Sequence, residues 1–355
     1  MCRCTLVTLT FRINVNINQF LGKKLAYVRL KEIAEQAGFS VNTVSRALKG
    51  KRDISKETRK KIKQIADELG YVPHAMAASL RSQTSRTIGV IVTFMDNPFY
   101  GRILQGINDA LAKHGFQAIT WGNNENVKQE QQILQNFAAY RVAGILLVPA
   151  CDLKNSIDYD ALKTPYIAIT RKSVNAQSYI AIDSYKSGSL VAEHFAKTGR
   201  KRPAYLGLDL PISSNYDRRL GYKETLEQLG LSLESRYDRS CSPSAKSAYL
   251  TLTEWVKENS TFDCIFVCTD QLAFGVLRAC KDLGIKVPDD IAIVGHDDVD
   301  NAQFSIPSLT TVRVPKYTLG YSSAETIIKM IKSKNAESLC TKTVTPKLII
   351  RESSC

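Results

Sequence analysis

The chain has 355 residues, 44% of them apolar, which is enough for two or three domains with cores of their own. Its nine cysteines, an odd and scattered set, predict no disulfide framework, and no apolar run approaches the roughly 20 residues of a membrane span. The net charge of +14 is local, because residues 23–81 hold 14 Lys or Arg against six Asp or Glu. This composition argues against a membrane protein and a disulfide-rich secreted domain, and it predicts a basic surface suited to phosphate groups.

Residues 1–26 look separate from the rest of the chain. Their alternating apolar residues have no evident partner strand, and Arg12 with several asparagines interrupts any signal-peptide core. We expect this extension to be disordered or to result from a miscalled start, because Gly22, Lys23 and Lys24 need purine-rich codons like those of a ribosome-binding site.

Residues 30–48, LKEIAEQAGFSVNTVSRAL, predict two short helices joined by a tight turn. Apolar side chains recur at i, i+3, i+4 and i+7 from Leu30, which forms one buried face. Gly38 can take a positive φ and end the first helix, and Ser40 is a good N-cap for the second. The second helix leaves the following side chains outward or at its rim: Val41, Asn42, Thr43, Ser45 and Arg46.

A third helix, with a basic outer face, is expected from residue 56 to about residue 69, where Gly70 stops it. The three helices would form a small all-α headpiece over residues 27–73. The turn has the spacing of a helix-turn-helix, whose second helix enters the DNA major groove. An ordinary corner between two helices is the alternative interpretation of this stretch.

The same motifs resemble the headpiece of the LacI/GalR family. The shared pattern is AxxAGxSxxTVSRxLxG from Ala34 to Gly50, followed by ISKETRKKI, LGYVP, ASLR, IGVIV, TDQLAFG, VGHDD and IPSLTTV. The resemblance covers about residues 30–351. It implies a cytoplasmic, homodimeric transcriptional repressor that binds double-stranded operator DNA and a small-molecule effector, with no enzymatic activity and no cofactor.

The resemblance also implies roles for individual residues at the DNA. Arg46 would contact a guanine, while Val41 and Asn42 would set the remaining base preference. Residues 74–85 match the hinge segment of the family, in which Leu80 would wedge into the minor groove at the operator centre. The predicted DNA-binding residues are Ser40, Val41, Asn42, Thr43, Ser45, Arg46 and Leu80.

From residue 87 onward, apolar strands alternate with helices. The predicted strands are 88–94, 116–122, 142–150, 164–170, 203–208, 264–269 and 291–298, and the predicted helices are 103–115, 126–141, 186–197, 218–229, 244–257 and 272–283. Strands that are apolar throughout indicate parallel sheets covered on both faces, so we expect α/β structure with two doubly wound subdomains. Resemblance to periplasmic sugar-binding proteins implies a first subdomain over 86–184 and 313–341, and a second over 185–312 and 342–355.

Ligands of open α/β sheets bind beyond the carboxyl ends of the strands, here between the two subdomains. The candidate effector-binding residues are Asn97, Phe99, Tyr100, Arg171, Arg218, Asp270 and Asp297. An aromatic ring can stack on a sugar or a purine, and arginine donors opposite aspartate acceptors suit a polyol. Arg171 matches the arginine of an Asp-Arg pair in ribose-type binders, but Thr170 stands where that pair has its acid.

Several alternatives stay open at this point. A regulator of the same family could respond to a purine or to a phosphorylated partner protein instead of a sugar. A solute-binding protein or an enzyme is less consistent with the sequence, which has no GxGxxG, Walker loop, GxSxG or HExxH motif. The four histidines are dispersed, and Cys264 and Cys268 have no second pair, so no metal site is predicted.

Overall fold

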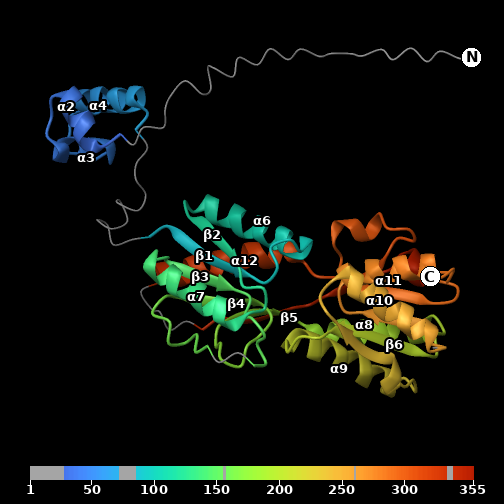
Figure 1. The fold of residues 1–355 in the computed structure, drawn as a ribbon. Coiled ribbons are helices and arrows are strands. Elements are labelled where there is room, and N and C mark those ends of the chain that lie inside the picture. Colours follow the sequence, from blue (N-terminus) through green and yellow to red (C-terminus); the bar gives the residue numbers. More distant parts are fainter. Residues whose placement is uncertain (1–27, 72–84, 155–156, 260, 334–338) are drawn as a thin grey trace, which may run out of the picture. The chain divides into compact units, whose positions relative to one another are not determined.

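A computed structural model describes residues 28–71, 85–154, 157–259, 261–333 and 339–355 (Figure 1). The chain divides into two units, residues 1–83 and residues 84–355, and each is described by itself. The extension 1–26, nearly all of the hinge 74–85 and the predicted wedge Leu80 lie outside the described residues.

The first unit is a three-helix headpiece made of α2 (Leu30–Ala37), α3 (Val41–Leu48) and α4 (Lys56–Leu69). Gly38 ends α2 with a φ of 75° and donates its N–H to the carbonyl of Ala34. The three helices share one apolar core, which consists of Ile33, Ala34, Ala37, Val44, Ala47, Ile62 and Ala66. The two helices and the turn predicted for residues 30–48 are therefore confirmed.

The second unit contains two six-stranded sheets. The first has the order β11-β5-β4-β3-β1-β2 and is parallel throughout, and the second has the order β12-β10-β9-β8-β6-β7, in which β12 is antiparallel to β10. The first-sheet strands are β1 (Thr87–Val92), β2 (Gln117–Gly122), β3 (Gly144–Leu147), β4 (Tyr166–Thr170), β5 (Tyr179–Ile182) and β11 (Thr341–Val344). The second-sheet strands are β6 (Pro203–Leu208), β7 (Asp238–Cys241), β8 (Cys264–Val267), β9 (Ala292–Asp297), β10 (Thr310–Arg313) and β12 (Lys347–Ile349). The predicted pair of α/β subdomains is confirmed.

Helices cover both sheets. They are α6 (Pro98–Lys113), α7 (Val127–Ala139), α8 (Ser184–Lys197), α9 (Ser213–Gln228), α10 (Ala245–Lys257), α11 (Asp270–Asp282) and α12 (Lys316–Lys332), and the short 3-10 turns are Ser235–Tyr237, Asp300–Gln303 and Glu352–Ser354. In Figure 1, α6 and α12 lie on one side of the first sheet and α7 on the other. None of the helices in the described part of the chain is long and apolar enough to cross a membrane.

Strand β1 shows why apolar residues run through a central strand without interruption. Its side chains alternate between the two faces of the sheet. Ile88 and Val90 pack in the core that includes α6 and α12, whereas Ile91 packs in the core that includes α7. Because both faces are buried, every position from Ile88 to Val92 is apolar.

In the described residues the chain passes between the two sheets three times, after β5, after β10 and after β11. The last crossing was predicted at residue 342, and this is wrong by a few positions. Strand β11 lies in the first sheet, where Thr341 pairs with Tyr179, so the crossing falls between Val344 and Lys347. This edge strand is largely exposed and polar, and it therefore carries no apolar run that would mark it in the sequence.

Glycines let helix backbones touch where two helices cross. A methyl group on Gly188 of α8 would collide with the carbonyl oxygen of Arg218, and one on Gly221 of α9 would collide with the carbonyl oxygen of Tyr185. Equally close approaches occur in the pairs α6–α12 and α10–α11 at Gly106, Gly320 and Gly275. The crossing of α8 and α9 fixes the backbone of Arg218 and thereby the base of its side chain.

Substitution of Gly221 by alanine should therefore destabilise the second unit. The new methyl group would meet backbone atoms, which cannot rotate away, so we expect a loss of about 1–3 kcal/mol, typical of overpacking. Thermal unfolding followed by circular dichroism measures the effect. The matched control is Gly101→Ala in α6, where a methyl group has nothing within 4 Å; it should leave stability unchanged or raise it. Equal melting temperatures for both variants would contradict the close crossing.

Candidate functional site

The exposed face of α3 is the first candidate site. Ser40 caps the helix, since its Oγ accepts the backbone N–H of Thr43 at 3.1 Å, and the two hydroxyl oxygens are 2.8 Å apart. Val41 follows with 41% of its surface exposed, unusual for a valine, and Asn42 is also exposed. The N-terminal turn of α3 thus presents one apolar and several polar groups to solvent.

Arg46 lies on the last turn of α3, and its guanidinium group is held by a carboxylate. Nε donates to Oδ2 of Asp53 at 2.8 Å, and Nη2 is 2.5 Å from the same oxygen. About half of each side chain is exposed. The sequence prediction did not include Asp53, although it stands in a loop rich in lysine and arginine.

Basic side chains surround this face. The exposed lysines and arginines between the end of α3 and the first turns of α4 are Lys49, Lys51, Arg52, Lys56 and Lys60. Such a cluster attracts the phosphate backbone of DNA whatever its base sequence. The headpiece therefore combines hydrogen-bonding groups on one helix with a basic surround.

The second candidate site is a cavity in the second unit, with about 770 Å³ of empty space that includes solvent at its mouth. Both sheets contribute to its wall, at the carboxyl ends of β1, β4, β6 and β9 and at the first turns of the helices that follow. Six of the seven predicted effector residues line it: Asn97, Phe99, Tyr100, Arg171, Arg218 and Asp297. Its size and its position at strand ends are typical of small-molecule sites.

The first turn of α6 forms the aromatic part of the wall. Asn97 caps the helix and accepts the N–H of Phe99 at 3.0 Å. The rings of Phe99 and Tyr100 meet edge to face, with centroids 5.0 Å apart. The Tyr100 hydroxyl is hydrogen-bonded to Thr93 at 2.7 Å, and burial raises the pKa of Tyr100 to about 12. These rings are therefore fixed and neutral.

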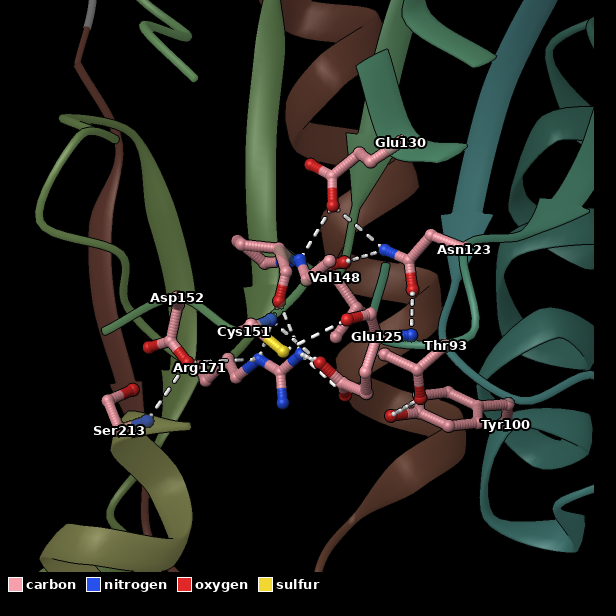
Figure 2. Close-up of polar contacts among 12 residues, drawn as sticks. Thr93, Tyr100, Asn123, Glu125, Glu130, Val148, Cys151, Asp152, Arg171 and Ser213 are labelled. Carbon is pink, nitrogen blue, oxygen red and sulfur yellow. Dashed lines mark hydrogen bonds and ion pairs between the residues drawn. The ribbon is translucent and has the colours of Figure 1, made fainter. Parts of the chain in front are cut away.

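Arg171 is paired with an acid, Glu125, which comes from the loop after β2 and not from the end of its own strand, β4. Its Nη2 is 2.8 Å from each carboxylate oxygen of Glu125, and its Nε donates to the carbonyl of Pro149 at 2.9 Å (Figure 2). The side chain of Arg171 is only 4% exposed. Within the described residues its Nη1 makes no hydrogen bond, and Arg171 lines the cavity.

A second carboxylate reaches Arg171 from the loop after β3. Asp152 Oδ1 lies 3.6 Å from Nε of Arg171 and accepts the backbone N–H of Ser213 at 2.9 Å. Burial raises the pKa of Asp152, and within the described residues its Oδ2 has no hydrogen-bond partner. Glu125 and Asp152 were both missed in the sequence, although each follows a predicted strand and the strand-end rule would have found them.

Arg218 reaches the cavity from the second turn of α9. It is buried, and its Nη1 donates to the carbonyl of Cys268. Its Nε has no hydrogen-bond partner within the described residues. A buried N–H of this kind costs free energy unless a ligand or water accepts from it.

Asp297 ends β9 with a φ of 118°, a backbone conformation that is rare for a non-glycine residue. Its Oδ1 lies 2.9 Å from Nδ1 of His296. Burial and the charge of Arg218 lower the pKa of His296 to about 4, so the ring is neutral at physiological pH. Strain at a ligand-facing position is common in binding sites.

The prediction that Asp270 contacts the effector is not supported by its position. Asp270 is fully buried and absent from the cavity wall, to which its neighbours Thr269 and Gln271 belong. Its two carboxylate oxygens accept hydrogen bonds from the Thr311 hydroxyl at 2.6 Å and from the Val299 N–H at 2.9 Å. The carboxylate therefore joins α11 to the loop after β9 and to β10, whereas Thr269 and Gln271 are the polar residues of this motif that line the cavity.

A buried acid supports the loops beneath Arg171. Glu130 accepts hydrogen bonds from the Ala150 N–H at 2.6 Å and from the Asn123 amide at 2.9 Å (Figure 2). It also accepts one from the Tyr159 hydroxyl at 2.5 Å. Burial raises its pKa from the usual 4.5 to about 7. The folded chain therefore holds a proton here at pH values where the unfolded chain does not.

This proton makes stability depend on pH. Since the folded pKa is the higher one, the stabilising contribution is complete below pH 4.5 and is lost as pH rises through 7. Chemical unfolding should give a free energy of unfolding that falls between pH 5 and pH 7 at up to about 1.4 kcal/mol per pH unit. Glu130→Gln, which resembles the protonated acid, should flatten this fall. Equal slopes for parent and variant would show that Glu130 is ionised in the folded state.

Comparisons with known proteins match both units. Residues 29–74 match the family described as "Bacterial regulatory proteins, lacI family", and residues 192–354 match the periplasmic binding protein-like domain. The ribose operon repressor of Haemophilus influenzae is 29% identical over 91% of this chain and 98% of its own. The HTH-type transcriptional repressor PurR of Photobacterium profundum is 27% identical over the same shares.

Among solved structures, a lac repressor dimer bound to operator and the anti-inducer ONPF is similar with a TM-score of 0.84, over 93% of this chain and 99% of that one. At 24% identity this likeness shows the fold alone. The headpiece and the cavity-bearing unit thus occur in the same order in relatives that align over nearly their whole length. The chain thus combines a headpiece of the lacI family of bacterial regulatory proteins with a periplasmic binding protein-like domain, which is the organisation of a DNA-binding transcriptional regulator with an effector domain.

Proposed function

We propose that this regulator is a homodimeric, cytoplasmic repressor whose operator affinity is set by a small neutral sugar or sugar-like effector bound in the cavity. The observation that carries the proposal is the presence of both a hydrogen-bond donor and a carboxylate acceptor in the wall of the cavity. Arg218 offers a buried N–H that has no partner among the described residues, and Asp297 offers a carboxylate. Because each hydroxyl of a polyol both donates and accepts, a sugar satisfies both groups at once.

The charges around the cavity favour a neutral ligand. The positive charge of Arg171 is already matched by Glu125, with Asp152 close by. The remaining arginine of the wall, Arg218, shares the cavity with the carboxylate of Asp297. A phosphate or carboxylate ligand would find no uncompensated positive charge among these groups, whereas a hydroxyl-rich ring does not need one. The similarity to a ribose operon repressor is consistent with such a ligand.

A purine is the second candidate effector. The fixed aromatic pair of Phe99 and Tyr100 would stack on a flat base, and one group of relatives is named PurR. Thermal-shift measurements on the full chain with pentoses, hexoses, hypoxanthine and guanine separate the two classes. Stabilisation by a sugar but not by a purine supports the proposal, and the reverse result assigns the cavity to a base.

Arg218→Ala should separate effector response from DNA binding. Loss of a charged hydrogen-bond donor in the cavity costs about 1.5–3 kcal/mol, which lowers effector affinity roughly tenfold to a hundredfold. Operator binding in a gel shift should match the parent when no effector is present, and about tenfold to a hundredfold more effector should be needed for the same response. The matched control is Arg219→Ala, because Arg219 is half exposed and pairs with Asp238 instead of lining the cavity. A full response in Arg218→Ala would remove Arg218 from the site.

Arg46→Ala should weaken operator binding and relax one base position. A bidentate contact between arginine and guanine contributes about 1–3 kcal/mol of discrimination, so specific affinity should fall by about one to two orders of magnitude. Gel shifts with selected duplexes and single-base variants measure both effects. Lys60→Ala removes an exposed charge from α4 and should weaken all duplexes alike. Unchanged base preference in Arg46→Ala would place the reading function elsewhere.

A further inference from the structure

Asp53 is the one acid in the loop that joins α3 to α4, between Lys49 and Lys56. Its Oδ2 accepts from Nε of Arg46 at 2.8 Å and lies 2.5 Å from Nη2. A carboxylate beside a DNA-facing helix repels every phosphate near it. Asp53 therefore lowers the affinity of the headpiece for DNA of any sequence. Its contact with Arg46 indicates a role that offsets this loss.

We propose that Asp53 is a specificity-determining residue of the DNA-reading surface, which positions the guanidinium of Arg46 for a guanine. The proposal rests on the role of Arg46 described above. Asp53 occupies the edge of the guanidinium formed by Nε and Nη2. Within the described residues Nη1 and the second proton of Nη2 stay free, and they point away from the aliphatic part of the side chain. Guanine presents two acceptors, O6 and N7, that match such a pair of donors.

The loop holds Asp53 in place from both sides. The Lys51 N–H donates to the carbonyl of Arg46 at 3.1 Å. From α4, Nη2 of Arg59 donates to the carbonyl of Lys51 at 2.7 Å and to that of Ile54 at 3.2 Å. Ile54 in turn packs against the headpiece core. The carboxylate is thus mounted on a braced loop, so it can restrict the rotamers of the long Arg46 side chain before DNA binds.

Asp53 then has two effects on DNA binding. A restricted Arg46 loses less side-chain freedom when it meets the correct base. The negative charge also weakens attraction to the phosphates of every sequence, correct or not. The first effect raises the ratio of specific to non-specific binding, whereas the second lowers the affinity for all sequences without changing that ratio. The pair itself is half exposed, so it adds little to the stability of the headpiece.

Selection from a randomised duplex library with the full-length protein, followed by sequencing, tests the proposal and needs no defined operator at the start. In Asp53→Asn the preference for guanine at the position that Arg46 reads should fall about tenfold, while affinity for random duplex rises. The matched control is Glu57→Gln, which removes the same charge from the first turn of α4 without contact to Arg46. It should raise affinity for random duplex and keep the guanine preference. Asp53→Glu, which keeps the charge within reach of Arg46, should retain most of the preference.

The outcomes separate this inference from the function on which it rests. If the parent enriches no motif, the chain does not read DNA in sequence-specific fashion and the proposed function fails. If Arg46→Ala enriches the same motif as the parent, Arg46 is not the reader and the inference falls with it. If Arg46→Ala lowers the preference for guanine at one position but Asp53→Asn leaves that preference as strong as in the parent, only the role of Asp53 is overturned. Equal loss in Asp53→Asn and Asp53→Glu would also overturn it, since the charge would then not matter.

Discussion

The buried guanidinium of Arg171 is the constraint on which the cavity region depends. A charge that is removed from water must find opposite charge and hydrogen bonds inside the protein, or its burial opposes folding. Here the loops after β2, β3 and β4 converge on it with Glu125, Asp152 and the carbonyl of Pro149 (Figure 2). Backbone strain accompanies this convergence, because Glu125, Cys151 and Thr170 all have positive φ. The charge therefore dictates the shape of three loops.

The same cluster connects the two α/β subdomains. Asp152 contacts Arg171 and also accepts the N–H of Ser213, the first residue of α9, while the Leu153 N–H donates to the carbonyl of Pro211 at 3.2 Å. Helix α9 also carries Arg218, so this carboxylate links Arg171 to the helix that holds the second arginine of the cavity wall. An effector that contacts both arginines interacts with both subdomains across this link. It can shift their arrangement only by as much as its affinity differs between the two arrangements.

Local patterns in the sequence predicted most of the fold. The helix-turn-helix follows from a period of 3.6 residues, a glycine and a capping serine, and strands such as β1 follow from continuous apolar runs. Strands β5, β7, β10, β11 and β12 were not predicted, because each has only three or four residues, and β7 and β11 are also polar and partly exposed at sheet edges. At the cavity, Asp270 and Gln271 are neighbours on α11, and only packing decides which side chain turns inward. Periodicity cannot resolve a difference of one residue at the first turn of a helix.

Arg46 and Arg171 share one physical arrangement, and in both the carboxylate partner is a residue that the sequence analysis did not name. In each case an acid binds the guanidinium through Nη2 and leaves Nη1 without a hydrogen bond in the described residues. A free arginine side chain samples many rotamers, and a ligand that binds it must select one of them. A fixed carboxylate makes that selection in advance and leaves two donors in a defined direction. The acids come from the loop that follows the reading helix and from a loop 46 residues away, so no local spacing rule links them to their arginines. Candidate ligand-binding arginines in chains of this kind are therefore better identified by their carboxylate partners in three dimensions than by the residues beside them in the sequence.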